Sequence, residues 1–340
     1  MSKLPELRRV NRISLQVNEV CDSRCRLCDY WRLENPKSMS AEVFQALVLP
    51  TLRGLSPLEN ICVTGGEPTL HPDLPAMLTA LAEVSRTLTL ITSTSGLDAV
   101  YEGIRPLIST YMVSMDGADR ATYRRTRGVD LFDGAFGWVR RLRAETAATI
   151  AVSFVIQQEN FDQLEAVAER SFAEGAHCVF LRVPSLTDDG FGRDGVVPLR
   201  TERAGVLTDG QIAVVTRQLA AIAGKYTREQ IPNVLDYGRF VRNLRGEQPA
   251  VGLTCDVPFT SMVIDPQGHY LPCFYLPFRA DLRDPQAATG LQREIQLSVL
   301  EDPGFRARHC DGCQQYVDRK WESRELNAEF HRQTLSAAAS

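Results

Sequence analysis

Seven of the nine cysteines in this chain of 340 residues fall into two spaced groups. The first group, Cys21, Cys25 and Cys28, places three thiols on one short segment. Three thiolates on one loop can hold three irons of a four-iron cluster and leave the fourth iron without a protein ligand. An open metal position can accept a substrate, as it does in catalytic zinc sites. The same spacing fits a zinc knuckle whose fourth ligand lies elsewhere in the chain.

The second group supplies four thiols, Cys255, Cys273, Cys310 and Cys313. Four thiolates close a site completely, as in a structural zinc ribbon or a fully ligated iron–sulfur cluster. The spacing fits both sites and by itself favours zinc. Because the N-terminal segment has no apolar core typical of a secretion signal, both groups indicate metal ligation rather than disulfides.

Short apolar runs alternate with amphipathic helical patterns from residue 12 to about residue 182, which predicts successive βα units and a parallel sheet. The fold class is therefore α/β, with a partial (β/α)6 barrel whose chemistry lies at the carboxyl ends of the strands. The predicted strands are Arg12–Asn18, Asn60–Thr64, Leu88–Thr92, Ser109–Ser114, Ile150–Ile156 and Cys178–Val183. The predicted helices are Ala41–Leu52, Leu74–Val84, Phe132–Glu145 and Phe161–Glu174, with further helices near Asp209–Tyr226 and Val234–Arg245.

The pattern changes after Gly252. Two apolar runs, Phe259–Ile264 and His269–Cys273, flank Asp265-Pro-Gln-Gly, where proline and glycine suit a hairpin turn. We therefore expect a barrel core over residues 1–200, a helical bridging segment over 201–250, and a small cysteine-rich α+β domain with a C-terminal helix over 251–340.

Two motifs together resemble those of the radical S-adenosylmethionine (SAM) superfamily. Cys-x3-Cys-x2-Cys follows the first predicted strand, and Gly65-Gly66-Glu67-Pro68 follows the second. The resemblance implies SAM bound to a [4Fe-4S] cluster on Cys21, Cys25 and Cys28, with the Gly-Gly-Glu turn touching the SAM amino group. Leu27 departs from the family pattern, which has an aromatic residue near adenine at that position; Tyr30 or Trp31 is the expected replacement.

Polar residues at later strand ends extend the resemblance. It implies SAM contacts for Ser93 and Ser95 after the third strand and for Ser114 and Asp116 after the fourth. In the run Tyr-Arg-Arg-Thr-Arg-Gly, it implies that Arg125 or Arg127 binds the SAM carboxylate. A strand-end serine is otherwise a turn residue or helix cap, and an arginine run is otherwise a solvated face.

The C-terminal cysteines resemble the twitch or SPASM domains that hold auxiliary clusters in this family. A full SPASM pattern has about seven cysteines, whereas this region has four, so the resemblance implies one closed auxiliary [4Fe-4S] cluster in a twitch-like domain. Such a cluster can accept an electron from a substrate radical.

An electron acceptor favours oxidation, and the simplest such reaction is dehydrogenation of an alcohol. The chain resembles aminoglycoside- and aminocyclitol-tailoring dehydrogenases. From its place at the end of the sixth strand, Arg182 is expected to orient a substrate hydroxyl or carboxylate; its alternative role is a surface salt bridge. Maturation of a peptide is the alternative. Such maturases often have an N-terminal leader-binding segment and more auxiliary cysteines, and neither is evident here. Epimerisation needs a hydrogen donor, but Cys62 and Cys178 lie in apolar runs and are expected to be core thiols.

Composition narrows the partners. A net charge of −4 gives no electrostatic footprint for nucleic acid or for an anionic membrane, and no run of 18 apolar residues occurs. We expect a cytoplasmic enzyme that takes a small molecule or a peptide and receives electrons from a flavodoxin or ferredoxin. A non-catalytic iron–sulfur sensor or zinc protein would leave the Gly-Gly-Glu turn without a purpose.

Overall fold

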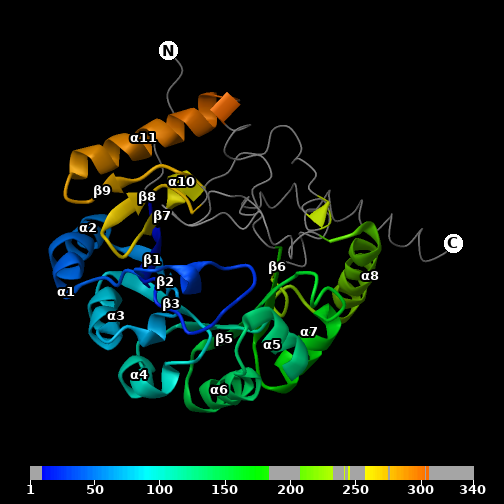
Figure 1. Ribbon diagram of the computed structural model, residues 1–340. Coiled ribbons are helices and arrows are strands. Elements are labelled where there is room, and N and C mark those ends of the chain that lie inside the picture. The colour runs from blue at the N-terminus through cyan, green and yellow to red at the C-terminus, as the bar shows by residue number, and fades with distance from the viewer. Residues whose placement is uncertain are drawn as a thin grey trace.

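The computed structural model describes residues 10–183, 207–232, 241, 244–245, 257–274, 276–302 and 304–305. One nine-stranded sheet organises this part of the chain, in the order β6-β5-β4-β3-β2-β1-β7-β8-β9. Its first six strands are all parallel, and β6 and β9 are its two edges, so the barrel is open (Figure 1). The six parallel strands are β1 (Arg12–Asn18), β2 (Leu58–Gly65), β3 (Ser85–Thr92), β4 (Thr110–Ser114), β5 (Thr149–Val155) and β6 (Cys178–Arg182). The six predicted strands and the α/β partial barrel are confirmed.

Helices cover the outer side of the curved sheet, where they form an arc (Figure 1). The arc contains α1 (Ala41–Val43), α2 (Leu49–Leu55), α3 (Leu74–Ala82), α4 (Leu97–Ile104), α6 (Phe132–Glu145), α7 (Leu164–Ala173) and α8 (Asp209–Lys225). A π-helical turn, Phe44–Val48, joins α1 to α2, and short 3-10 helices span Tyr30–Arg32 and Pro68–Leu70. Apolar residues of the outward strand positions pack against these helices in one core, for example Val63 and Leu90 with Leu78.

The inner side of the sheet is packed differently. Along β4, Tyr111 and Val113 belong to the outer core, whereas the alternating Met112 faces the inner side with Ala151 and Cys178. Cys178 is buried, as a core thiol is expected to be. Cys62 is only partly buried on the inner side, because the register of β2 assigns Ile61 and Val63 to the outer core. Its thiol is buried but lies outside the apolar core on the outer side of the sheet.

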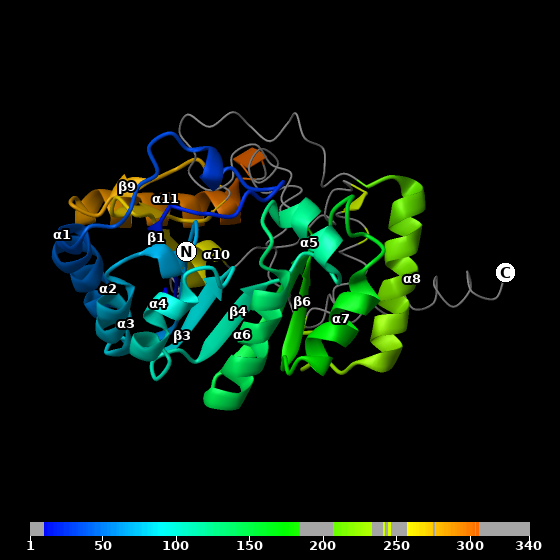
Figure 2. The same ribbon diagram turned by 60° about the horizontal axis from the view of Figure 1, so that its bottom comes forward.

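Helix α5 (Arg120–Arg127) lies above the helical arc near the strand ends (Figure 2). Neither α5 nor α4 was predicted. The sequence of α5 has no apolar stripe, whereas α4 buries one side, with Leu97, Val100 and Ile104. The end signals of α5 are nevertheless strong: the Asp119 carboxylate accepts from Thr122 N at 2.8 Å, and Gly128 ends the helix in the left-handed region with φ +68°.

The C-terminal hairpin continues the barrel's sheet. β7 (Ser261–Ile264) pairs parallel with β1, and β8 (His269–Leu271) returns antiparallel, as the turn residues predicted. The Asp265 carboxylate accepts from the backbone N–H groups of Gln267 and His269, both at 2.9 Å, which closes the turn. The division of the chain into three domains remains a prediction.

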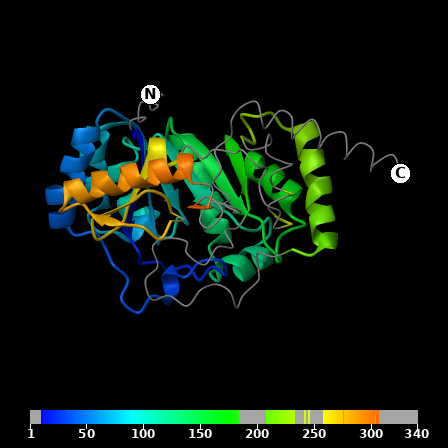
Figure 3. The ribbon, with the colours of Figure 1, turned by 90° about the horizontal axis from the view of Figure 1, so that it is seen from above.

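The rest of the described C-terminal part contains α10 (Val257–Thr260), β9 (Ala280–Asp281) and α11 (Pro285–Glu301). Asp284 caps α11 by accepting from two of its backbone N–H groups. Figure 3 shows α11 and α8 at opposite ends of the molecule. A small second core forms beside α11 from Cys273, Leu276, Ile295, Val299 and Phe305. No helix of the described part is long and apolar enough to cross a membrane.

Candidate active site

The glycine pair at the end of β2 meets the chain that leads into the first cysteine group. Gly66 N donates to Asn18 O at 2.8 Å, and Glu67 N donates to Val20 O at 2.7 Å. A Cβ added at Gly65 would lie 2.3 Å from Asn18 O, and one at Gly66 would lie 2.3 Å from Val20 O. Since both obstacles are backbone atoms, only glycine permits this approach. The Gly-Gly pair therefore fixes where the cysteine loop, residues 19–28, leaves β1.

The middle of the cysteine loop is bound to the end of α5. Arg24 N donates to Arg127 O at 2.9 Å, and Arg26 N donates to Thr126 O at 3.1 Å. These two bonds flank Cys25. A Cβ on Gly128 would lie 2.5 Å from Arg24 O, so the left-handed glycine that ends α5 also makes room for the loop. The last turn of α5 therefore positions Cys25.

The three thiols of the loop lie close enough to affect one another electrostatically. Burial raises the pKa of Cys21 to about 11 and that of Cys25 to about 12, with Arg127 opposing the shift at Cys25. Buried thiols become thiolates only beside positive charge, which a bound metal or a buried cation supplies. Within the described residues, no three His, Cys, Asp or Glu side chains form a site for a single metal ion. As ligands of a four-iron cluster, the three sulfurs would each bind a separate iron.

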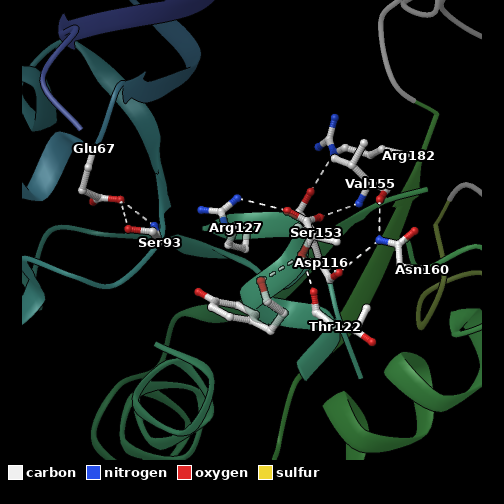
Figure 4. Close-up of polar contacts among 11 residues, drawn as sticks. Glu67, Ser93, Asp116, Thr122, Arg127, Ser153, Val155, Asn160 and Arg182 are labelled. Atoms are coloured by element: carbon white, nitrogen blue, oxygen red, sulfur yellow. Dashed lines mark hydrogen bonds and ion pairs between the residues drawn. The ribbon is translucent and has the colours of Figure 1, made fainter. Parts of the chain in front are cut away.

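Glu67 is a buried hub that joins the ends of β2 and β3. One carboxylate oxygen accepts from Thr69 N, from Thr69 Oγ1 at 2.6 Å and from Thr92 Oγ1 at 2.7 Å. The other accepts from the backbone N and Oγ of Ser93, at 2.5 and 2.7 Å (Figure 4). A carboxylate offers about four lone-pair sites, so these donors occupy it fully. Glu67, which the sequence predicted to contact SAM, therefore holds the loops after β2 and β3 together.

The turn after β3 links that hub to the cysteine loop. Ser93 Oγ lies 3.2 Å from Ser95 Oγ, and Ser95 Oγ donates to the Asp22 carboxylate at 2.9 Å. Between them, Thr94 adopts a left-handed conformation with φ 77°. Such a conformation costs a β-branched residue about 1–3 kcal/mol and occurs most often at functional sites. Ser93 and Ser95 therefore connect Glu67 to the cysteine loop.

Asp116, just beyond β4 and Ser114, forms a second junction (Figure 4). One carboxylate oxygen accepts from Arg127 Nη1 at 3.1 Å and the other from Val155 N at 2.8 Å. Asn160, which belongs to none of the motifs found in the sequence, donates from Nδ2 to the Asp116 carbonyl at 3.1 Å. Arg125 instead donates to Thr122 Oγ1 at 2.8 Å, and it lines a surface cavity of about 510 Å³. The structure therefore brings Arg127, not Arg125, to Asp116.

Arg182 reaches over the inner side of the sheet from the end of β6. Its Nε donates to Ser153 Oγ at 3.0 Å, and its Nη2 lies 3.3 Å from Met112 Sδ. The guanidinium also acts on Cys62: burial raises the pKa of that thiol to about 11, and Arg182 opposes the shift. A cation therefore lies at the carboxyl end of the barrel's inner face, where the sequence placed it.

Comparison with protein families matches residues 15–170 to the radical SAM superfamily. These residues form a radical SAM domain. They span β1 through α7 and include the cysteine loop, the Glu67 hub and Asp116.

Curated relatives of the radical SAM domain match it at low identity. The GTP 3′,8-cyclase of Erythrobacter litoralis is 26% identical over 180 residues, covering 49% of this chain and 52% of the relative. A probable GTP 3′,8-cyclase of Saccharolobus islandicus is 23% identical over 172 residues, covering 50% and 55%. The chain thus spans about half the length of the curated relatives it matches.

Solved structures share the radical SAM domain's fold over a longer stretch. Streptococcus suis SuiB bound to SAM aligns with a TM-score of 0.61 and 14% identity, over 83% of this chain and 68% of SuiB. The enzyme anSMEcpe with bound SAM aligns with a TM-score of 0.62 and 16% identity, over 96% of this chain and 98% of that protein. At such identities, the likeness concerns the fold.

The other predicted site residues lie around the radical SAM domain as follows. Tyr30 is buried behind the cysteine loop, where its hydroxyl accepts from Gln16 Nε2 at 2.8 Å. Trp31 Nε1 donates to Cys25 O at 3.1 Å. Cys273 is buried in the small second core. The other predicted auxiliary ligands, Cys255, Cys310 and Cys313, lie outside the described residues.

The residues present fit the cofactors of the family. Cys21, Cys25 and Cys28 provide a thiolate donor set on one loop, and Gly65 and Gly66 bring a second loop against it. Superfamily members use SAM and a [4Fe-4S] cluster, so these three residues would hold the cluster. The polar strand ends that surround them would hold SAM.

Proposed function

We propose that this chain reductively cleaves SAM and uses the resulting radical to abstract a hydrogen atom from a substrate. The supporting observation is that three segments meet the three-cysteine loop. Gly66 packs against the start of the loop, Ser95 donates to Asp22, and the end of α5 accepts backbone hydrogen bonds on either side of Cys25. When bound, the reduced cluster would give one electron to the sulfonium and release methionine and a 5′-deoxyadenosyl radical.

The protein's own residues would order and shield this chemistry. Ser95, Ser114 and the Gly65-Gly66-Glu67 turn would bind SAM at the strand ends, and Tyr30, which is buried and bonded to Gln16, would supply the aromatic residue near adenine. Arg182, fixed by Ser153, would orient a substrate oxygen or carboxylate on the inner face. Exclusion of water and of stray hydrogen donors would protect the radical.

We propose dehydrogenation of an alcohol in an aminoglycoside-like sugar or cyclitol as the overall reaction. The substrate carbon would lose a hydrogen atom to the radical, its oxygen would lose a proton, and the remaining electron would pass to the auxiliary cluster. The four C-terminal cysteines support this proposal, since a fully ligated cluster accepts electrons without binding substrate. A flavodoxin or ferredoxin would supply the electron that starts each turnover.

Peptide modification is the second candidate. It is favoured by the fold neighbours SuiB and anSMEcpe, each of which has also been solved with a peptide, SuiA and Cp18Cys respectively. The two candidates differ in where deuterium in 5′-deoxyadenosine would come from. Transfer from a ring-deuterated aminocyclitol supports the first, and transfer from a deuterated peptide supports the second.

Anaerobic reconstitution tests the proposed cleavage itself. With iron and sulfide, we expect about eight irons in the wild type and about four in a Cys21/Cys25/Cys28→Ala variant. With dithionite and SAM, only the wild type should form 5′-deoxyadenosine. Cys178→Ala is the matched control, because it removes a buried thiol outside the loop. Absence of 5′-deoxyadenosine from fully loaded wild type would refute the proposal.

A further inference from the structure

Two buried donors on α5, the Nε–H of Arg127 and the Oη–H of Tyr123, have no hydrogen-bond acceptor among the described residues, although the two side chains interact with each other. Tyr123 is fully buried, and the Arg127 side chain is 12% exposed. Residues four apart lie on the same face of a helix, so the two groups are neighbours. Since nearly all buried polar groups in proteins are paired, two adjacent donors without an acceptor indicate an acceptor that the described residues do not themselves provide.

The charge environment indicates where that acceptor lies. Burial lowers the pKa of Arg127, but Cys25 and Asp116 outweigh it and leave the pKa well above its ordinary value. Burial raises the pKa of Tyr123 to about 12, and Cys25 is again among the charges that act on it. Both unpaired groups therefore lie within electrostatic reach of one thiol.

The backbone holds this arrangement in place. The loop's Arg24 and Arg26 N–H groups donate to the last carbonyls of α5, on either side of Cys25. The guanidinium is fixed from its other side by Asp116, which Val155 N holds in turn. The backbone on either side of Cys25 and the Arg127 guanidinium are therefore both held by hydrogen bonds.

We propose that Arg127 and Tyr123 donate hydrogen bonds to sulfur of the cluster at Cys25 and thereby raise its reduction potential. This inference rests on the proposed function, because it assumes that Cys25 is a cluster ligand. Hydrogen bonds to cluster sulfurs and nearby positive charge stabilise the form that carries the additional electron. Arg127 and Tyr123 are thus positioning residues that make the cluster easier to reduce.

Tyr123→Phe and Arg127→Lys test the proposal on the reconstituted full chain. Tyr123→Phe removes only the hydroxyl, and Arg127→Lys keeps the charge beside Asp116 but removes Nε. The matched control is Tyr111→Phe, which removes another buried, unpaired hydroxyl, on β4 and outside the influence of Cys25. Titration with dithionite is followed by electron paramagnetic resonance (EPR), using only the signal that changes when SAM is added.

We expect Arg127→Lys to lower the reduced-to-oxidised ratio of that cluster at a fixed potential about tenfold, which is about 59 mV toward more negative values. Tyr123→Phe should lower the ratio about threefold, since it removes one neutral donor. Tyr111→Phe should leave it unchanged.

An unshifted titration of Tyr123→Phe at wild-type iron content would overturn the proposal, even if Arg127→Lys failed to fold. An equal shift in Tyr111→Phe would also overturn it. Absence of any SAM-responsive signal in the wild type would instead count against the proposed function, so the two failures are distinguishable.

Discussion

The outer and inner sides of the same sheet differ in how tightly apolar side chains are packed. The outer side packs large apolar residues against helices, and Val63, Leu78 and Leu90 are fully buried there. In the part of the chain that the structure describes, the inner side has a small apolar cluster around Met112, and Cys62 and Arg182 are partly exposed. Since strand residues alternate between the two sides, one sequence supplies both environments. The outer side stabilises the fold. The inner side and the carboxyl ends of the strands, called the rim, are where we propose that ligands bind.

Gly66→Ala should displace the cysteine loop at the rim without changing the packing of the outer side. It has the largest expected effect on activity. The new Cβ would meet Val20 O at 2.3 Å, so the start of the cysteine loop must move. A misplacement of about 1 Å can cost about 10²-fold in rate, and we expect at least that loss in 5′-deoxyadenosine formation, with less iron bound.

The control for this change is Gly54→Ala in the last turn of α2, where a Cβ meets nothing within 4 Å. It should keep wild-type iron content and activity. If Gly66→Ala also kept both, close approach of the two loops would not be what requires glycine.

Leu78→Ala should do the reverse, by weakening the outer side without changing the site. Leu78 is fully buried on α3, and loss of a buried leucine side chain costs about 2–5 kcal/mol in unfolding free energy. Chemical denaturation followed by circular dichroism measures this loss. The rate of 5′-deoxyadenosine formation per loaded cluster should stay at the wild-type value at 25 °C. A parallel loss of rate would show that the two sides are not independent.

Ser153→Ala has the smallest expected effect and tests the inner side alone. It removes the hydroxyl that accepts from Arg182 Nε, a contact worth about 1 kcal/mol. We expect substrate-dependent 5′-deoxyadenosine formation to fall about fivefold to tenfold, because Arg182 is no longer oriented. Cleavage of SAM without substrate should be unchanged. An equal fall in both rates would place Ser153 in SAM binding instead.

The sequence predicted the strands and the cysteine loop because both signals are local. Apolar runs such as Ile150–Ile156 define strands wherever they pack, and the thiol spacing lies within one loop. Helix α5 was missed although Asp119 and Gly128 marked its ends, because helices were sought by their apolar stripes. Its charged sequence also concealed the burial of Arg127, which depends on Asp116 and on the docked loop.

Other features depend on contacts that no local pattern contains. Glu67 is saturated by Thr92 and Ser93, which lie more than twenty residues further along the chain. The hairpin was predicted from Asp265-Pro-Gln-Gly, but the turn does not specify which strand it joins. Its parallel pairing with β1 follows from the space left beside β1 when the other strands are in place.

That pairing determines when, during synthesis on the ribosome, the sheet can be completed. β1 leads directly into the cysteine loop, yet its second neighbour, β7, begins only at Ser261. While the ribosome is still making the intervening chain, one side of β1 carries exposed backbone donors and acceptors, which are prone to join other chains. Synthesis must therefore pass Ile264 before the strand beneath the cysteine loop is fully bonded. A nascent chain stopped earlier would present the three-cysteine loop on an unfinished edge.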